Sequence, residues 1–382
     1  MFFMIRIFLL SLISLASLMA QTQYELIDSE RLGDREIKIQ LPRNYNENSE
    51  AFYPLIVILD GDYLFETIAG TVDYMAYWDD MPEAIVVGIN QVRTRSEDLF
   101  LSEEDHFPIR GGAKFYEFLG AELVPYLIDK YRVGKFKVAV GHGESANFIN
   151  FFSFVKTPLF QAYIAMSPSL TPFMSENLIQ RLPTVSSSLF YYLATATEDF
   201  KENRKTILGL NDKLNTEEFK ALSYKFDDFK NHNHYSLVSS AIPSALKHIF
   251  GIYQPISREE YKTKILSLES SAVDYLRQKY DRITSLFGIE KQILLNDFRA
   301  TAAALNKKEA YQYYKDLAKL ARKNYPKSLL SNFYIGRFYE GSAQPRKAIK
   351  AYQEAFVYDE IDGITKEDML DRAERLKVEY DY

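Results

Sequence analysis

Short runs of apolar residues alternate with longer amphipathic segments between residues 36 and 252. Several of the short runs are almost continuously apolar, which is typical of strands in a parallel sheet that helices cover on both faces. The longer segments repeat apolar residues at helical spacing. The alternation predicts a doubly wound, mostly parallel α/β sheet. The expected strands are residues 37–41, 55–59, 84–89, 137–140, 163–166 and 189–193, and the expected helices are residues 114–130, 146–155, 201–215 and 239–250.

The pattern changes after residues 253–255. From residue 257 to 382 no strand-like run appears, and Lys, Glu, Ala, Leu and Tyr dominate at helical spacing. Part of this region fits the tetratricopeptide pattern, a helical repeat of about 34 residues. A generic helical bundle with alanine at close helix contacts is the alternative interpretation. The residues at repeat spacing are Asn332, Ile335, Gly336, Tyr339, Ala348, Tyr352 and Ala355, and, one period earlier, Ala318, Ala321 and Pro326. The earlier unit departs from the pattern at Tyr314, where the repeat has a small residue.

The first twenty residues have the features of a secretory signal peptide. Arg6 precedes an apolar run over residues 7–18, and a small residue, Ala20, precedes Gln21. A membrane anchor is the alternative, but the run is shorter than the ~20 residues of a spanning helix. We therefore expect cleavage after Ala20, export to a periplasm or the medium, and no membrane span afterwards. The expected domains are residues 21–252 and 257–382.

Composition narrows the class of protein. Lys plus Arg number 46 against 52 Asp plus Glu, so the formal net charge is −6 and the pI is near 5.6. This balance argues against a nucleic-acid binder, which needs a basic surface to neutralise phosphates. There are no cysteines, which excludes disulfides, thiolate metal sites and a cysteine nucleophile. No phosphate-binding glycine loop, dinucleotide motif or calcium loop is present, so we expect no cofactor.

The candidate chemistry lies where a predicted strand runs into a predicted helix. The buried run from Phe136 leads into Gly141-His-Gly-Glu-Ser145, and a helical pattern follows. A strand, a sharp turn and a helix form the nucleophile elbow, G-x-S-x-G, of the α/β-hydrolases. The turn lifts the central side chain above the sheet, and the backbone N–H groups that follow face a developing oxyanion.

Residues 36–252 resemble the Putative esterase family of α/β-hydrolases, which includes esterase D-type, siderophore and feruloyl esterases. The resemblance implies an α/β-hydrolase fold and a carboxylic-ester substrate class. It also implies oxyanion donors near Gly61 and Asp62 and at the N–H of Glu144, with His142 supporting the turn. The matching segments are Leu41-Pro42, residues 53–62 with Leu59-Asp60-Gly61, residues 85–90 with Arg93 and Asp98, residues 118–126, Tyr131-Arg132 and Ser167-Pro168-Ser169.

The elbow departs from the family pattern Gly-His-Ser-x-Gly-Gly. Gly141 and His142 match, but Gly143 stands in the place of the serine and has no side chain with which to attack. Ser145, two residues later, is either a helix cap or a shifted nucleophile. Glu144 is expected to be a first-turn acid that the helix dipole favours, or alternatively to hold a water.

The family resemblance also implies the remaining members of the triad. The segment Lys230-Asn-His-Asn-His234-Tyr-Ser236 resembles the family's histidine loop and places the general base at His234. The acid is expected after the strand at 189–193, with Glu198 as the first choice and Asp199 as the alternate. His232 and His234 could form a metal pair, but a catalytic zinc site usually has three protein ligands and no third is evident, so we expect no metal.

Three functions fit these residues. The first is an exported, non-catalytic esterase homologue that binds an ester-like small molecule in the old cleft, or a protein through the repeat-like tail. The second is a working ester hydrolase in which His234 activates water or Ser145 attacks. The third is a structural export or assembly factor that uses the helical tail alone. Gly143 favours the first function.

Overall fold

The chain forms two compact units, one ending at Gly251 and the other comprising Ile252–Tyr382. The computed structural model describes all residues except 1–21, 46–49, 187, 217–218 and 220. The expected signal peptide therefore lies outside the described residues. Among the described residues, no helix is long and apolar enough to cross a membrane.

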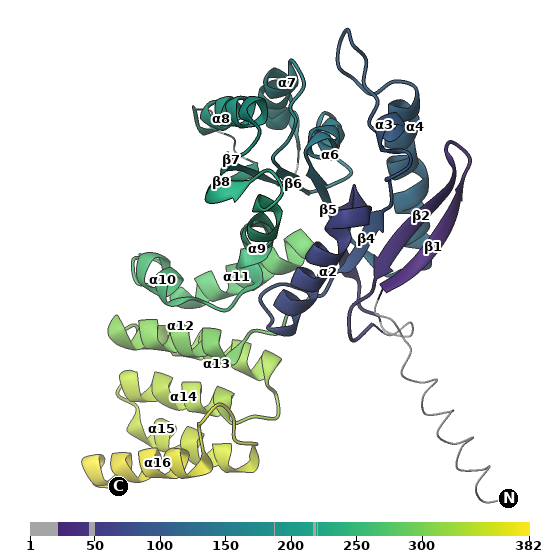
Figure 1. The fold of residues 1–382 in the computed structure, drawn as a ribbon. Helices are drawn as coiled ribbons and strands as arrows, with labels where there is room; N and C mark the ends of the chain where they lie inside the picture. Colours follow the sequence, from purple (N-terminus) through teal and green to yellow (C-terminus); the bar gives the residue numbers. More distant parts are fainter. Residues whose placement is uncertain (1–21, 46–49, 187, 217–218, 220) are drawn as a thin grey trace, which may run out of the picture. The chain divides into compact units, whose positions relative to one another are not determined.

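The first unit contains one eight-stranded sheet in the order β1-β2-β4-β3-β5-β6-β7-β8 (Figure 1). β1 and β2 pair antiparallel, as do β2 and β4, and every other neighbouring pair is parallel. The predicted α/β fold class is confirmed. The strands are β1 (Thr22–Ser29), β2 (Gly33–Gln40), β3 (Tyr53–Ile58), β4 (Ile85–Ile89), β5 (Val133–His142), β6 (Ala162–Met166), β7 (Leu189–Glu198) and β8 (Leu222–Asn233).

Six of these strands contain the six apolar runs, and the two that the pattern missed are β1 and β8. Both lie at the edges of the sheet. Only Ile27 and Ser29 of β1 are buried, and no residue of β8 is fully buried. Because an edge strand keeps part of its surface in water, its sequence is not a continuous apolar run.

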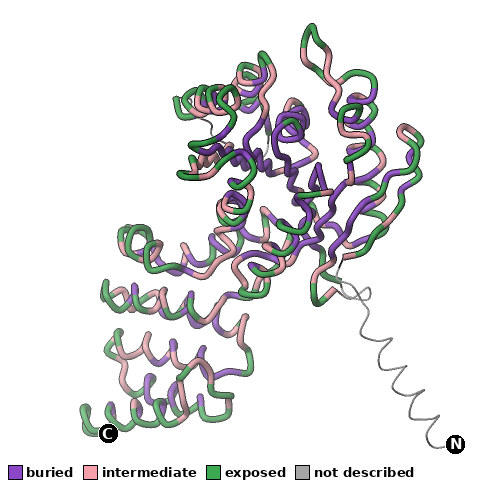
Figure 2. The backbone as a smooth tube through the Cα atoms, viewed as in Figure 1, coloured by how far each residue is buried: buried purple, intermediate pink, exposed green. Residues whose placement is uncertain are grey.

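Helices of the first unit cover both faces of the sheet. On one face, Leu55 and Val57 of β3 lie in a core cluster with residues of α4, η1, α5 and α7. Ile56 and Ile58 point to the opposite face and are equally buried. Figure 2 shows the central strands buried along their length. The helices are α2 (Gly61–Tyr77), α3 (Arg95–Asp98), α4 (Gly111–Glu117), η1 (Phe118–Leu123), α5 (Val124–Lys130), α6 (Glu144–Phe148), η2 (Ile149–Ser153), α7 (Met174–Arg181), η3 (Leu182–Thr184), α8 (Lys201–Thr216) and α9 (Leu237–Phe250), with η4 (Gly251–Tyr253) at the boundary.

The described residues of the second unit form helices and no strand, as the sequence predicts. The repeat-like residues lie on α13, on the neighbouring helices α14 and α15 and at the start of η7, except Pro326, which follows α13. Gly336 of α14 faces the ring of Tyr352 on α15, so closely that a Cβ at Gly336 would lie 2.1 Å from the ring. The helices are α10 (Arg258–Glu260), η5 (Tyr261–Ile265), α11 (Ala272–Phe287), α12 (Leu295–Lys307), η6 (Tyr311–Tyr313), α13 (Tyr314–Asn324), α14 (Leu330–Gly341), α15 (Pro345–Glu354), η7 (Ala355–Val357) and α16 (Lys366–Tyr380).

Candidate active site

The turn between β5 and α6 has a backbone conformation that favours glycine. Gly143 has φ 62° and ψ −120°, in the region that residues with a side chain rarely adopt. A Cβ built on Gly143 would lie 3.7 Å from Nε2 of His234 and 3.9 Å from Oγ of Ser169, both ordinary contacts. Gly141 is different, because its Cβ would lie 2.5 Å from the backbone of Ser145. The chain can therefore turn sharply here, and the direction of the absent Gly143 side chain is toward His234.

Ser145 closes this turn. Its Oγ accepts a hydrogen bond from the His142 N–H at 2.9 Å and donates to the His142 carbonyl at 3.0 Å. The side chain is completely buried. Ser145 neither caps the helix as expected nor presents a free hydroxyl to the site.

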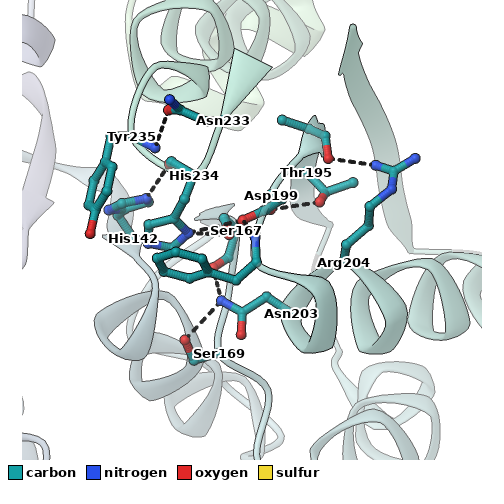
Figure 3. Close-up of polar contacts among 12 residues, drawn as sticks. His142, Ser167, Ser169, Thr195, Asp199, Asn203, Arg204, Asn233, His234 and Tyr235 are labelled. Carbon is teal, nitrogen blue, oxygen red and sulfur yellow. Dashed lines mark hydrogen bonds and ion pairs between the residues drawn. The ribbon is translucent and has the colours of Figure 1, made fainter. Parts of the chain in front are cut away.

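His234 is held by two groups at its Nδ1. Oδ1 of Asp199 lies 3.0 Å away and Oγ of Ser167 lies 2.8 Å away, and the Ser167 hydroxyl also donates to Asp199 at 2.8 Å (Figure 3). An ionised carboxylate can only accept hydrogen bonds, so Nδ1 of His234 carries the proton in the neutral ring. Nε2 of that ring then keeps its lone pair. Nε2 is the atom that faces Gly143. The geometry is that of a general base with an orienting carboxylate.

Asp199, and not the first choice Glu198, is the carboxylate that contacts His234. Glu198 is the last residue of β7 and its side chain is exposed. Burial by itself would raise the pKa of Asp199, but hydrogen bonds from His234, Thr195 and Ser167 and from the Phe200 N–H hold that pKa below its usual value. Asp199 therefore stays ionised beside the histidine.

His142 lies against His234 and is neutral. The two ring centroids are 4.3 Å apart, and Nε2 of His142 donates to the His234 carbonyl at 2.9 Å. Its Nδ1 accepts from the Tyr63 hydroxyl at 3.1 Å. Burial, with the neighbouring His234 ring as a second cause, lowers the pKa of His142 to about 4. His142, which was expected to support the turn, thus contacts the His234 loop through its Nε2.

The residues expected near an oxyanion lie beside this turn, but their side chains have other partners. Asp62 accepts from the backbone N–H groups of Gln91 and Val92 at 2.5 and 2.9 Å. Gly61 packs on the backbone of β4, where a Cβ would lie 2.7 Å from Gly88. Glu144 begins α6, so its N–H has no acceptor within the helix. The N–H of Glu144 is therefore a candidate oxyanion donor.

A network of charges borders the turn on the α3 side. Arg95 donates to Asp60 at 2.7 Å and also pairs with the exposed carboxylate of Glu144. A cleft of about 600 Å³ opens beside it. Its lining includes Arg93, Arg95, Phe100, Glu144, Asn147, Phe148, Ser169 and Thr171. A small molecule in this cleft would lie next to the Gly143 turn.

Sequence reasoning missed several side chains that shape the site. Ser167, expected only as part of a turn, has φ 43° and is completely buried between Asp199 and His234. The Phe200 ring stacks on His234 at 4.2 Å, and Asn203 donates to the Ser169 hydroxyl at 3.1 Å. The one available signal was the motif Ser167-Pro168-Ser169 after a buried strand.

The alternative of a metal pair at His232 and His234 has no support from the geometry. Nδ1 of His232 lies 2.8 Å from the Lys230 carbonyl, and its Nε2 lies 2.9 Å from the Ser240 hydroxyl. Both ring nitrogens of His232 are therefore engaged away from His234. Within the described part of the chain, no three histidine or carboxylate side chains converge as a metal site.

The sheet order and the β5–α6 turn define an α/β-hydrolase, and comparisons with known proteins agree. A family model described as Putative esterase matches residues 29–216, and the chain belongs to this family. It is similar to an uncharacterised protein from Capnocytophaga ochracea, with 32% identity and a TM-score of 0.84 over 94% of this chain and 100% of that one.

Two other solved structures share the fold at lower identity. An IroE-like serine hydrolase from Shewanella oneidensis has 20% identity and a TM-score of 0.58 over 79% of this chain and 99% of its own. The siderophore hydrolase EstA from Aspergillus nidulans has 17% identity and a TM-score of 0.52 over 60% of this chain and 93% of its own. No curated protein matches the chain.

Proposed function

We propose that this protein is an esterase homologue that does not hydrolyse by the serine route and that binds an ester-like small molecule in its cleft. The observation that carries the proposal is Gly143. Its φ and ψ are suited to a nucleophile elbow. A Cβ built on it lies 3.7 Å from Nε2 of His234, which would bring a side-chain hydroxyl within reach of that base. The hydroxyl is missing from this position. We infer that Gly143 occupies the vacant nucleophile position.

The remaining groups are suited to holding a carbonyl compound. The Glu144 N–H can face a carbonyl oxygen, and Nε2 of His234 faces the same turn. Without a nucleophile, an ester bound here would not form an acyl intermediate. The cleft of about 600 Å³ lies within the usual range for small-molecule sites.

A second candidate is slow hydrolysis by water that His234 activates. The observation that favours it is the retained base, with Asp199 and Ser167 both at Nδ1 and a lone pair on Nε2. Oxyanion stabilisation and binding alone can leave roughly 10³-fold to 10⁴-fold acceleration in a hydrolase without its triad. The shifted-serine alternative is weaker, because Ser145 is buried with its hydroxyl bonded to His142.

We also propose that the protein is exported after cleavage at Ala20 and that the helical unit binds a protein partner. The signal-like residues 1–20 support export. The repeat-like spacing on α14 and α15, with Gly336 packed on Tyr352, supports a role in partner binding.

Hydrolysis of p-nitrophenyl acetate tests the central part of the proposal. Wild type should match buffer, and Gly143→Ser should gain turnover because a hydroxyl then lies within reach of His234. Gly143→Ala is the matched control, since it adds the same Cβ without the hydroxyl. Gly143→Ser combined with His234→Ala should lose the gain, by roughly 10²-fold to 10⁴-fold. Wild-type turnover that His234→Ala abolishes would instead establish the water-activating enzyme.

A further inference from the structure

A second hollow lies in the first unit and shares no lining residue with the cleft beside Gly143. It has a volume of about 420 Å³. Its wall is formed from the loop before α4, from α4 itself, from η2 and the residues after it, and from the last residue of α7. The residues that carry the argument are Phe107, Ala113, Phe151, Phe154, Val155 and Arg181.

Three neighbouring phenylalanine rings form the apolar part of this wall. The rings of Phe107 and Phe151 have centroids 5.5 Å apart, those of Phe151 and Phe154 are 5.6 Å apart, and those of Phe107 and Phe154 are 6.1 Å apart. Phe107 is 38% exposed and Val155 is 45% exposed, so the wall is open to solvent. An apolar segment placed here would release water from all these surfaces.

One side of the hollow carries the positive charge of Arg181. Arg181 is exposed at the end of α7, and among the residues that the structure describes no carboxylate forms an ion pair with it. The acid that also lines the hollow is Glu117, and it pairs with Arg31 at 3.0 Å. The hollow therefore offers an available guanidinium beside an aromatic wall.

We propose that this hollow is a binding site for a small amphipathic carboxylate, such as a medium-chain aliphatic acid. The aliphatic chain would pack on the three phenylalanine rings, and the carboxylate would pair with Arg181. A guanidinium binds a carboxylate through two parallel N–H···O bonds, which makes arginine the suitable cation here. The site goes beyond the proposed function, because it does not involve Gly143, His234 or the cleft beside them.

Isothermal titration of the full-length mature protein with sodium decanoate tests this site. We expect saturable binding of one decanoate to wild type. Arg181→Gln should weaken binding roughly fivefold, the upper value for an ion pair at an exposed site. Decanol, which has no carboxylate, should bind wild type more weakly than decanoate does, by the same factor. Its affinity for Arg181→Gln should equal its affinity for wild type. Ala113→Trp, which fills the hollow from α4, should abolish binding.

Arg93→Gln is the matched control, because Arg93 is an exposed arginine that lines the other cleft. It should leave decanoate binding unchanged. If Arg93→Gln weakens binding and Arg181→Gln does not, decanoate occupies the cleft and the proposal is wrong. Equal affinity for decanoate and decanol would overturn the carboxylate class, and so would tighter binding of decylamine. No saturable binding would overturn the site. None of these results bears on the loss of serine hydrolysis.

Discussion

At the scale of single residues, the glycine at position 143 matters for stability as well as for the proposed loss of a nucleophile. A residue with a side chain at φ 62° is strained by about 1–2 kcal/mol, and glycine avoids that cost. A serine nucleophile at such a turn is held in the strained conformation, and the turn presents its hydroxyl to the base. At Gly143 this strain is absent and so is a hydroxyl, while Asp199 and Ser167 contact Nδ1 of His234.

Replacing Gly143 should therefore destabilise the protein even though space is available. We expect Gly143→Ser and Gly143→Ala each to lower the free energy of unfolding by about 1–2 kcal/mol. The measurement is urea denaturation followed by circular dichroism. Gly70→Ala is the control, because Gly70 is exposed within α2 with no atom within 4 Å of its built Cβ. That change should stabilise the protein by up to about 1 kcal/mol. Equal effects at both glycines would contradict strain at residue 143.

The buried histidine pair should make stability depend on pH. The pKa of His142 is about 4 in the folded protein, against an ordinary value of 6.5. The unfolded chain therefore binds the proton more readily, and the stability that neutral His142 contributes is lost as the pH falls from about 6.5 toward 4. The loss should amount to roughly 3 kcal/mol.

Urea denaturation at several pH values measures this dependence. His142→Gln should remove most of the slope between pH 6.5 and 4. A smaller share should remain, because burial also lowers the pKa of His248. An unchanged slope in His142→Gln would contradict the account of this residue.

The sequence alone could not decide which of Glu198 and Asp199 contacts His234. Adjacent residues at the end of a strand point to opposite sides, so either Glu198 or Asp199 could face His234. The choice depends on where β7 ends, and the structure extends it to Glu198. Ser167 was missed for a related reason, because its φ of 43° follows from the packing around it and not from local sequence.

At the scale of elements, the apolar pattern predicts what is buried. It predicts the buried central strands, and it misses the edge strands β1 and β8, most of whose residues are not fully buried. It also misses α2, which begins directly after the β3 turn at Gly61. His234, the proposed base, follows an edge strand rich in charged and polar residues. Its position was predicted through the family's histidine motif and not through periodicity.

The pairing of α14 with α15 depends on the absence of a side chain at Gly336. A Cβ there would lie 2.1 Å from the completely buried ring of Tyr352. We expect Gly336→Ala to lower the stability of the helical unit by roughly 1–3 kcal/mol through overpacking, although alanine favours helix. Thermal unfolding measures the change. Adding Tyr352→Leu should recover part of the loss, and no recovery would contradict a steric origin.

At the scale of the whole molecule, the change of sequence pattern near residue 253 coincides with a division into two compact units. The alternation of strands and helices before it and the purely helical pattern after it follow from different ways of burying apolar surface. What each unit binds cannot be read from these patterns, because binding depends on which side chains border a hollow. Arg181 and Phe107 are far apart in sequence and line the same one.

Export is a property of the whole chain and is tested on the protein made by cells. We expect intact-mass analysis of the exported protein to give a chain that begins at Gln21. Ala20→Tyr should block cleavage, because signal peptidase sites need a small residue there. Detection of the chain from Met1 in wild type, in the cytoplasmic fraction, would contradict the proposed export.

The central claim is that no activated serine faces His234, and covalent labelling tests it most directly. Wild type, Gly143→Ser and Gly143→Ser/His234→Ala would be treated with a fluorophosphonate, which forms a stable adduct with an activated serine, and measured by intact mass and peptide mapping. The account predicts no adduct on wild type and one adduct at residue 143 of Gly143→Ser that needs His234. A wild-type adduct at Ser145, Ser167 or Ser169 that is lost in His234→Ala would contradict it.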